Sequence, residues 1–455
     1  MTDAGRTVPG NRWDLLDGLC ADPPPLVSVI VVHYRQQSEL DRTLASLARQ
    51  TYPAHLIEVI VVDDGSPEPP TVPPGVRLLR QRDDGFRAAA ARNAGAAVAR
   101  GTVLCFLDAD TSPEPGYIAA LSRLPALAPD VVTIGRRLHA DLDRADHTLP
   151  GVPVEIAGPQ HPLPDPAWLR EHYVATNNLL QADDRSYRYV IGAVLACSRA
   201  LFAEVGGFDE TFTTYGGEDW EWAYRAWLAG ALLAHEPRAV GWHNGPDWSG
   251  RSAAGADRQR AKNLETARLA HLIPAPASRG RGLHFAHADV QVVLAAADSP
   301  VGGAAPCGRE LDAAAVLVCV DSVLEALPAA VVEVPDESFE LLPRDRRVIP
   351  RSVGATSPPV LDRVRIRVLL HGPVTVTAAG LGAAIERVTR EELASLTLTD
   401  ADGIALVTVV SARAAARIAR WGDPSLFEAR AEAAHWVEPV DGQPDLEAWF
   451  GGWGR

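Results

Sequence analysis

The sequence lacks a long apolar run, paired cysteines and an excess of basic residues, and each absence excludes a class of protein. No uninterrupted apolar stretch approaches the roughly 18–20 residues of a membrane-spanning helix, and residues 1–12 are polar where a secretory signal would be apolar. The cysteines are odd in number and lack the spacing of metal ligands: Cys20, Cys105, Cys197, Cys307 and Cys319. We therefore expect neither a disulfide framework nor a zinc cluster, and a reducing, cytoplasmic environment.

Basic side chains are outnumbered, with 43 Lys and Arg against 58 Asp and Glu and a net charge of −15. Lys262 is the only lysine, and arginine supplies the remaining positive charge. A general nucleic-acid-binding protein needs a basic face for the phosphates, so this balance argues against one. The 455 residues, of which 47% are hydrophobic, suffice for two or three globular domains.

The first part of the chain alternates buried strands with amphipathic helices. After a leader at residues 1–25, short β-branched runs predict strands at residues 26–32, 58–62, 76–79 and 102–107. Helical spacing of apolar residues predicts helices at 38–49 and 86–100. This alternation is typical of an α/β fold with a mostly parallel sheet, in which ligands bind beyond the carboxyl ends of the strands.

The pattern loosens at residues 141–189, which are rich in proline and poor in periodic apolar residues. Because this stretch is long for a structureless connection, we expect a functional lid or an acceptor region there. A linker rich in Pro, Ala, Arg and Gly at residues 276–282 is expected to separate residues 26–275 from a second, smaller α/β domain at 283–455. The expected elements of that domain are strands at 315–320, 364–370 and 404–410, and helices at 383–393 and 412–421.

Acidic pairs follow two of the predicted strands. Asp108 and Asp110 come directly after the strand at 102–107, and Asp63 and Asp64 end the strand at 58–62. Carboxylates at a strand end can hold Mg²⁺ or Mn²⁺, which would bridge a nucleoside diphosphate, or can accept hydrogen bonds from a base or ribose. Both strings also occur in ordinary solvated turns, and Asp64-Gly65 is compatible with a simple turn.

Three further strings carry side chains that could bind a ligand or take part in catalysis. Arg87 and Arg92 lie at the start of the predicted helix at 86–100, where an anion such as a diphosphate binds well, although either could pair with a nearby acid. Glu218 and Asp219 open a helix after two glycines and beside tryptophans; Asp219 could be a general base or only a helix cap. His243 follows a short apolar strand and would complete a metal site if it met Asp110; alone, it could equally be structural.

Taken together, the strings of residues 26–250 resemble glycosyltransferase family 2, the inverting enzymes with a GT-A fold. The matching strings, in the order of the family, are VSVIVV, VVDDGS, DGFR with ARNAG, FLDAD, VGGFDE and GGEDWE. The DGFR string and the Glu-Asp helix followed by Trp-His are most similar to chondroitin-polymerase-like and galactosyltransferase-like domains. The resemblance does not extend beyond about residue 275.

The resemblance implies a nucleoside-diphosphate sugar donor, UDP-linked, and a glycan or small-molecule hydroxyl acceptor. Asp63 or Asp64 would hold the nucleobase, with the other one structural. Arg92 would face the nucleotide, and Asp108 would contact the ribose or the metal. The family's metal, Mn²⁺ or Mg²⁺, would be bound by Asp110 and His243.

The resemblance also assigns the chemistry of transfer. Asp219 would be the catalytic base, with Glu218 beside it in contact with acceptor or sugar. An asparagine that is common in the family's glycine loop is replaced here by Ala193, which leaves the sugar specificity open. From their position in the chain, and not from the resemblance, we expect Arg136, Arg137 and residues 141–189 to shape the acceptor pocket, and the C-terminal domain could mediate a homo-oligomer.

Other functions fit the sequence less well. A nucleotidyltransferase or a Rossmann oxidoreductase would need a glycine-rich phosphate loop after the first strand, where this chain has residues 33–37, HYRQQ. The remaining alternative is a non-catalytic module that binds a sugar nucleotide or a glycan. The acids of the C-terminal part, such as Asp321 and Asp400, lack supporting arginines, so we expect no second active site there.

Overall fold

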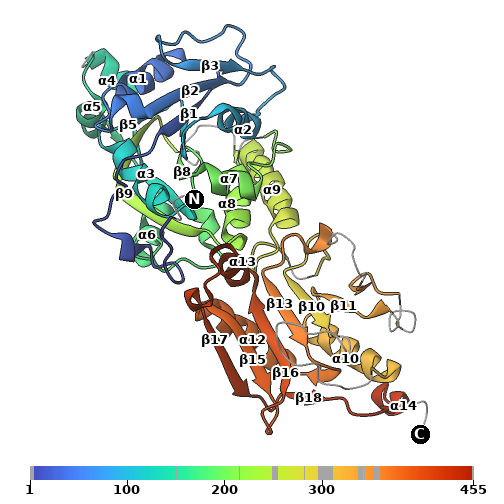
Figure 1. Cartoon of the computed structure of the whole chain (residues 1–455). Helices are drawn as coiled ribbons and strands as arrows, with labels where there is room; N and C mark the ends of the chain where they lie inside the picture. The colour runs from blue at the N-terminus through green and yellow to red at the C-terminus, as the bar shows by residue number, and fades with distance from the viewer. Residues whose placement is uncertain are drawn as a thin grey trace. The chain divides into compact units, whose positions relative to one another are not determined.

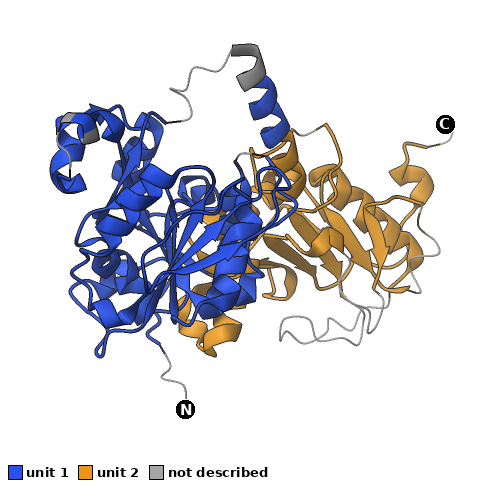
Figure 2. Cartoon of the chain, turned by 90° about the horizontal axis from the view of Figure 1, so that it is seen from above, with its two compact units in different colours: residues 1–227, 231–266 blue, residues 228–230, 267–455 orange. Residues whose placement is uncertain are grey.

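The computed structural model describes residues 5–148, 151–214, 216–247, 255–280, 282–295, 311–336, 342, 344–351 and 359–452. The chain forms two compact units (Figures 1 and 2). The first comprises residues 1–227 and 231–266, and the second comprises residues 228–230 and 267–455. The boundary at residue 266 lies within a helix, upstream of the linker predicted at 276–282. Across the described ranges, no helix is long and apolar enough to cross a membrane.

The first unit is built on one large sheet with strand order β3-β2-β1-β4-β8-β6-β9-β5, to which β7 adds on β6. Strands β1, β2, β3 and β4 are parallel, β8 runs against β4 and β6, and β6 and β9 are parallel again. The strands are β1 (Val27–His33), β2 (Ile57–Asp63), β3 (Arg77–Arg80), β4 (Val103–Asp108), β5 (Thr111–Pro113), β6 (Val131–Ala140), β7 (Pro162–Leu163), β8 (Val194–Ser198) and β9 (Leu232–Asn244).

Helices of the first unit cover this sheet. They are α1 (Gln37–Leu47), α2 (Ala88–Val98), α3 (Tyr117–Leu127), α4 (Leu142–Thr148), α5 (Val154–Gln160), α6 (Ala167–Ala175), α7 (Arg199–Val205), α8 (Glu218–Leu228) and the first part of α9 (Gly255–Leu272), which from residue 267 on belongs to the second unit. Alanine and glycine let α2 lie close to β1 and β2: a Cβ on Gly95 would come within 2.5 Å of Ile30 Cγ2. Helix α2 accordingly lies beside β1 and β2 (Figure 1).

The second unit has its own sheet, with strand order β12-β11-β10-β13-β16-β15-β17, and a two-stranded ribbon of β14 and β18. Its strands are β10 (Val290–Leu294), β11 (Val331–Val334), β12 (Val348–Pro350), β13 (Ile366–Leu370), β14 (Val374–Val376), β15 (Leu393–Thr399), β16 (Ala405–Ser411), β17 (Glu428–Ala433) and β18 (Val437–Pro439). Its helices are α10 (Ala313–Ala326), α12 (Ala378–Arg390), α13 (Ala412–Trp421) and α14 (Leu446–Trp449). The predicted class, an α/β domain with a mostly parallel sheet followed by a second α/β domain, is confirmed.

One local prediction was wrong. Residues 315–320, expected as a strand, lie inside helix α10, where the side chain of Asp312 caps the first turn by accepting from the N–H groups of Ala314 and Ala315. Residues 141–189, expected to form a functional lid or an acceptor region, contain the helices α4, α5 and α6. Proline precedes two of these helices, as the N-caps Pro153 and Pro166, so here it starts helices instead of breaking them.

Candidate active site

A cavity of about 960 Å³ opens at the carboxyl edge of the first unit's sheet. It lies beyond the ends of β1, β2 and β4, and the N-terminus of α8, the end of β9 and residues of α6 and α9 contribute to its walls. This is the edge at which parallel sheets bind their ligands. Seven of the residues predicted from the sequence line it: Asp64, Arg92, Asp108, Asp110, Glu218, Asp219 and His243.

The two acids at the end of β2 have different surroundings. Asp63 is fully buried and accepts hydrogen bonds from Ser66 Oγ, His33 Nδ1 and Arg80 Nε. Burial opposes ionisation, but these donors outweigh it and lower the pKa of Asp63. The carboxylate of Asp63 therefore stabilises the turn after β2.

Asp64, by contrast, lines the cavity. Its Oδ2 accepts from the backbone N–H of Arg87 at 2.8 Å, and the amide of Gln81 donates to Oδ1. Burial raises its pKa, because these donors compensate only in part for lost hydration. Of the two acids, Asp64 is the one positioned to contact a ligand.

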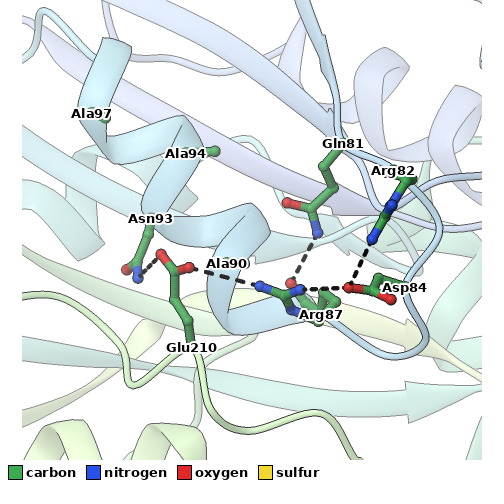
Figure 3. A pocket seen from close by; sticks show the side chains of 9 residues that line it. All are labelled: Gln81, Arg82, Asp84, Arg87, Ala90, Asn93, Ala94, Ala97 and Glu210. Atoms are coloured by element: carbon green, nitrogen blue, oxygen red, sulfur yellow. Dashed lines mark hydrogen bonds and ion pairs between the residues drawn. The ribbon is translucent and has the colours of Figure 1, made fainter.

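Arg87 does not line the large cavity. Its side chain lies in a neighbouring hollow of about 520 Å³, where it faces Asp84 at 3.4 Å and Glu210 at 3.7 Å (Figure 3). Glu210 is also held by the amide of Asn93, 3.0 Å away. Arg87 thus ties the start of α2 to the segment after α7, and we leave its side chain out of the donor site.

Arg92 joins three elements at the floor of the cavity. Only 4% exposed, it donates to Asp108 Oδ1 at 2.9 Å and to Glu218 Oε1 at 2.8 Å. Its guanidinium also lies 5.5 Å from the centre of the Phe208 ring. A charge this buried is stable only when paired, so Arg92 fixes the relative positions of β4 and the first turn of α8.

Asp110 and His243 meet across the antiparallel pair β5 and β9. Asp110 Oδ2 lies 3.5 Å from His243 Nε2 and 3.4 Å from the amide of Gln36. The Nδ1 of His243 lies 3.2 Å from the carbonyl oxygen of Gly245, and Nε2 faces Asp110; the tautomer that donates from Nδ1 to this carbonyl leaves a lone pair on Nε2. Burial lowers the pKa of His243, which favours this neutral ring.

A lone pair and a carboxylate that face each other suit a bound cation between them. Asp108, predicted as a second metal ligand, accepts a hydrogen bond from Arg92 with Oδ1 and also lines the cavity. In the part of the chain that the structure describes, no three His, Cys, Asp or Glu side chains gather closely enough to hold a metal by themselves. The protein can therefore supply two ligands at this point, and the remainder must come from substrate or water.

Asp219 lies at the first turn of α8 with its carboxylate held by two backbone groups. The N–H of Gly192 donates to Oδ2 at 3.0 Å, and the N–H of Trp220 donates to Oδ1 at 2.8 Å. Burial, followed by the charge of Glu218, raises the pKa of Asp219 to about 7. A carboxylate with such a pKa exchanges protons near neutral pH, which a general base requires.

Several cavity residues were not predicted from the sequence. Tyr34 and Gln36 follow β1, and the rule that ligands bind at strand ends could have found them. Lys262 and Glu265 come from α9, where no local motif marks them.

Of the two arginines predicted near an acceptor pocket, Arg137 lines the cavity and pairs with Asp247 at 3.2 Å, whereas Arg136 is exposed.

Comparison with known proteins supports the resemblance. Residues 28–153 match the family Glycosyl transferase family 2, and residues 172–239 match the N-terminal domain of galactosyltransferase. Chondroitin synthase of Escherichia coli is 28% identical over 284 residues, covering 57% of this chain and 39% of that protein. Validoxylamine A glucosyltransferase of Streptomyces hygroscopicus subsp. limoneus is 34% identical over 225 residues, covering 44% of this chain and 48% of the relative.

The chain spans less than half the length of each of these relatives. Among solved structures, a mannosyltransferase from Pyrobaculum calidifontis in complex with GDP-Man and Mn²⁺ is 19% identical with a TM-score of 0.38, covering 59% of this chain and 67% of that one. The motifs, their order and the family matches agree. Residues 28–153 of the first unit are therefore similar to glycosyltransferase family 2, the family that the sequence motifs resemble.

Proposed function

We propose that the protein is an inverting glycosyltransferase that moves a sugar from a nucleoside diphosphate, UDP in the first instance, to a hydroxyl group of a glycan or small-molecule acceptor. The observation that carries this proposal is the convergence of Asp64, Asp110, His243 and Asp219 on one cavity at the carboxyl edge of the sheet. Each group has the chemistry that one part of the reaction needs.

The nucleotide is assigned to the end of the cavity beside β2. Asp64 would accept a hydrogen bond from the base, and Tyr34, which is 37% exposed, offers an aromatic face next to it. Asp63 has its own partners and is assigned a structural role.

Asp110 and His243 fit a divalent cation, since a carboxylate oxygen and an imidazole lone pair approach each other there. Mg²⁺ and Mn²⁺ commonly keep waters and substrate phosphates as ligands, so two protein ligands suffice. When bound, the cation would neutralise charge on the diphosphate leaving group. The nitrogen ligand favours Mn²⁺ over Mg²⁺, which prefers an all-oxygen shell.

Asp219 is assigned the role of general base. Its carboxylate would take the proton of the acceptor hydroxyl while that oxygen attacks the anomeric carbon and the nucleoside diphosphate leaves from the opposite face. A single displacement of this kind inverts the anomeric configuration. Glu218 lines the same cavity beside Asp219 and is assigned a contact to the acceptor or the sugar.

The alternative is a module that binds a sugar nucleotide without turning it over. A donor screen separates the two: purified protein is incubated with Mn²⁺ and UDP-, GDP- or dTDP-sugars, and nucleoside-diphosphate release is recorded with and without EDTA. The proposal predicts slow release from one donor, abolished by EDTA. Tight nucleotide binding without release, also when acceptors are added, would favour the alternative, and no binding at all would refute both.

A further inference from the structure

One wall of the cavity is aromatic and has no part in the proposed donor site. Trp168, on α6, is 45% exposed, and Trp220 follows Asp219 on α8. Both line the cavity, with ring centroids 6.4 Å apart and ring planes at 77°. Trp168 also packs against Tyr189, at 5.7 Å between centroids, which fixes its position from behind. The two indoles line the same cavity as the candidate base Asp219, and an exposed aromatic surface of this kind marks a binding site.

The charges around this wall are already paired. Lys262 Nζ lies 2.8 Å from Glu265 Oε1 and 5.3 Å from the centre of the Trp220 ring. Arg137 pairs with Asp247. Among the described residues that line the whole cavity, seven are acidic and four are basic. The acidic residues are Asp64, Asp108, Asp110, Glu218, Asp219, Asp247 and Glu265, and the basic ones are Arg35, Arg92, Arg137 and Lys262.

We propose that Trp168 and Trp220 form the acceptor subsite and that the acceptor presents a hydroxylated ring without an acidic group. This inference rests on the proposed function, because it takes Asp219 as the base. The apolar face of a sugar or cyclitol ring would pack on the indoles, and carboxylates such as Glu265 would accept from its hydroxyls. An acidic acceptor would instead bring its own carboxylate against these acids, and like charges in such a site oppose binding.

A calorimetric titration with two matched probes tests this proposal. The probes are p-nitrophenyl β-D-glucopyranoside and p-nitrophenyl β-D-glucuronide, which differ by one carboxylate. Each is titrated into the full chain with Mn²⁺ and whichever of UDP, GDP or dTDP binds most tightly. We expect the glucoside to bind at least about tenfold more tightly than the glucuronide.

Substitutions then assign the binding to the aromatic wall. Trp168→Ala and Trp168→Leu should weaken glucoside binding at least about fivefold, whereas Trp168→Phe keeps an aromatic face and should retain it. Val174→Ala, at a 78% exposed position on the same helix, is the matched control and should have no effect.

Three results would overturn the proposal: no glucoside binding to the wild type, binding unchanged in Trp168→Ala and Trp168→Leu, or a preference for the glucuronide that Lys262→Met abolishes. The nucleotide titration of the same samples separates this inference from the function on which it rests. Failure of the wild type to bind any nucleotide would refute the proposed function itself. Nucleotide binding with glycoside binding that is independent of Trp168 would refute only the acceptor subsite.

Discussion

The carboxylate of Asp219, a single residue, has both properties that a general base needs: a fixed orientation and a raised pKa. Two backbone N–H groups fix its orientation at the cavity, and burial with the neighbouring charge of Glu218 shifts its pKa upward to about 7. The first property holds the base in place, and the second keeps it basic enough to accept a proton from a hydroxyl group.

This pKa predicts the pH dependence of transfer. Below pH 7 the carboxyl group is protonated and cannot act as a base, so kcat/KM should fall about tenfold for each pH unit below the pKa. Above it, the rate should level off. A pH–rate profile measured on the active donor checks this, and a flat profile between pH 5 and 8 would contradict the assignment of Asp219.

Metal binding should depend on His243 and Asp110. Replacing either (His243→Ala or Asp110→Asn) removes one of two protein ligands, so the affinity for Mn²⁺ in the presence of nucleoside diphosphate should fall at least about tenfold. Calorimetry gives this affinity without reference to activity. His55→Ala, at an exposed position, is the control; equal Mn²⁺ affinity in all variants would refute the assigned site.

Arg92 should matter for stability as much as for function. Arg92→Met would leave Glu218 buried and Asp108 partly buried without their partner, and should lower the free energy of unfolding by about 3 kcal/mol. Arg92→Lys keeps the charge but cannot reproduce the guanidinium's hydrogen bonds to both carboxylates, so its loss of stability should be smaller than that of Arg92→Met. Urea unfolding followed by circular dichroism measures both, and equal stability of Arg92→Met and wild type would contradict this role.

At the scale of elements, close packing of α2 explains where Arg92 lies. Gly95 faces Ile30 and Val62, and an added Cβ would collide with Ile30. Gly382, in the middle of α12, has open space instead. Gly95→Ala should therefore cost about 1–3 kcal/mol by overpacking, whereas Gly382→Ala should stabilise by up to about 1 kcal/mol through helix propensity. Thermal unfolding of the two variants checks the opposite signs; shifts of the same sign would contradict the packing of α2.

Secondary-structure elements with a clear pattern of apolar residues could be predicted from the sequence. An element whose type is indicated only by its capping residue could not. The strand before Asp108 was recognised from a short buried apolar run, and the helix that carries Arg92 from the spacing of its apolar residues. Helix α10 was taken for a strand because residues 315–320 are uniformly apolar, and a short apolar run does not distinguish the two. The signal that could have decided was the N-cap Asp312.

The candidate site was predictable wherever its residues follow a strand or open a helix. Asp64, Asp110 and Asp219 meet that description, and all three line the cavity. Trp168 and Glu265 do not, because they reach the cavity from α6 and α9, far away in sequence. Arg87 is the opposite case. Its position at the start of α2 fits an anion site, but its side chain forms ion pairs with Asp84 and Glu210.

At the scale of the whole molecule, the cavity draws all its lining residues from positions 32–265, within the first unit. The second unit has a separate core, built around β10, β13 and β16 with α10 and α12. A ligand stabilises the unit that binds it. In calorimetry, nucleoside diphosphate with Mn²⁺ should therefore raise the unfolding temperature of one transition and leave a second one unchanged. One transition that shifts as a whole would contradict separate unfolding of the units.

The proposed role of Asp219 as the general base is tested most directly by comparing the turnover of wild type and Asp219→Asn on the donor found in the screen. The amide cannot accept the proton, so turnover should fall about 10²–10⁴-fold, while calorimetry gives an unchanged affinity for the nucleotide sugar and Mn²⁺. Wild-type turnover in Asp219→Asn, with binding intact, would show that the base lies elsewhere and would contradict the central claim.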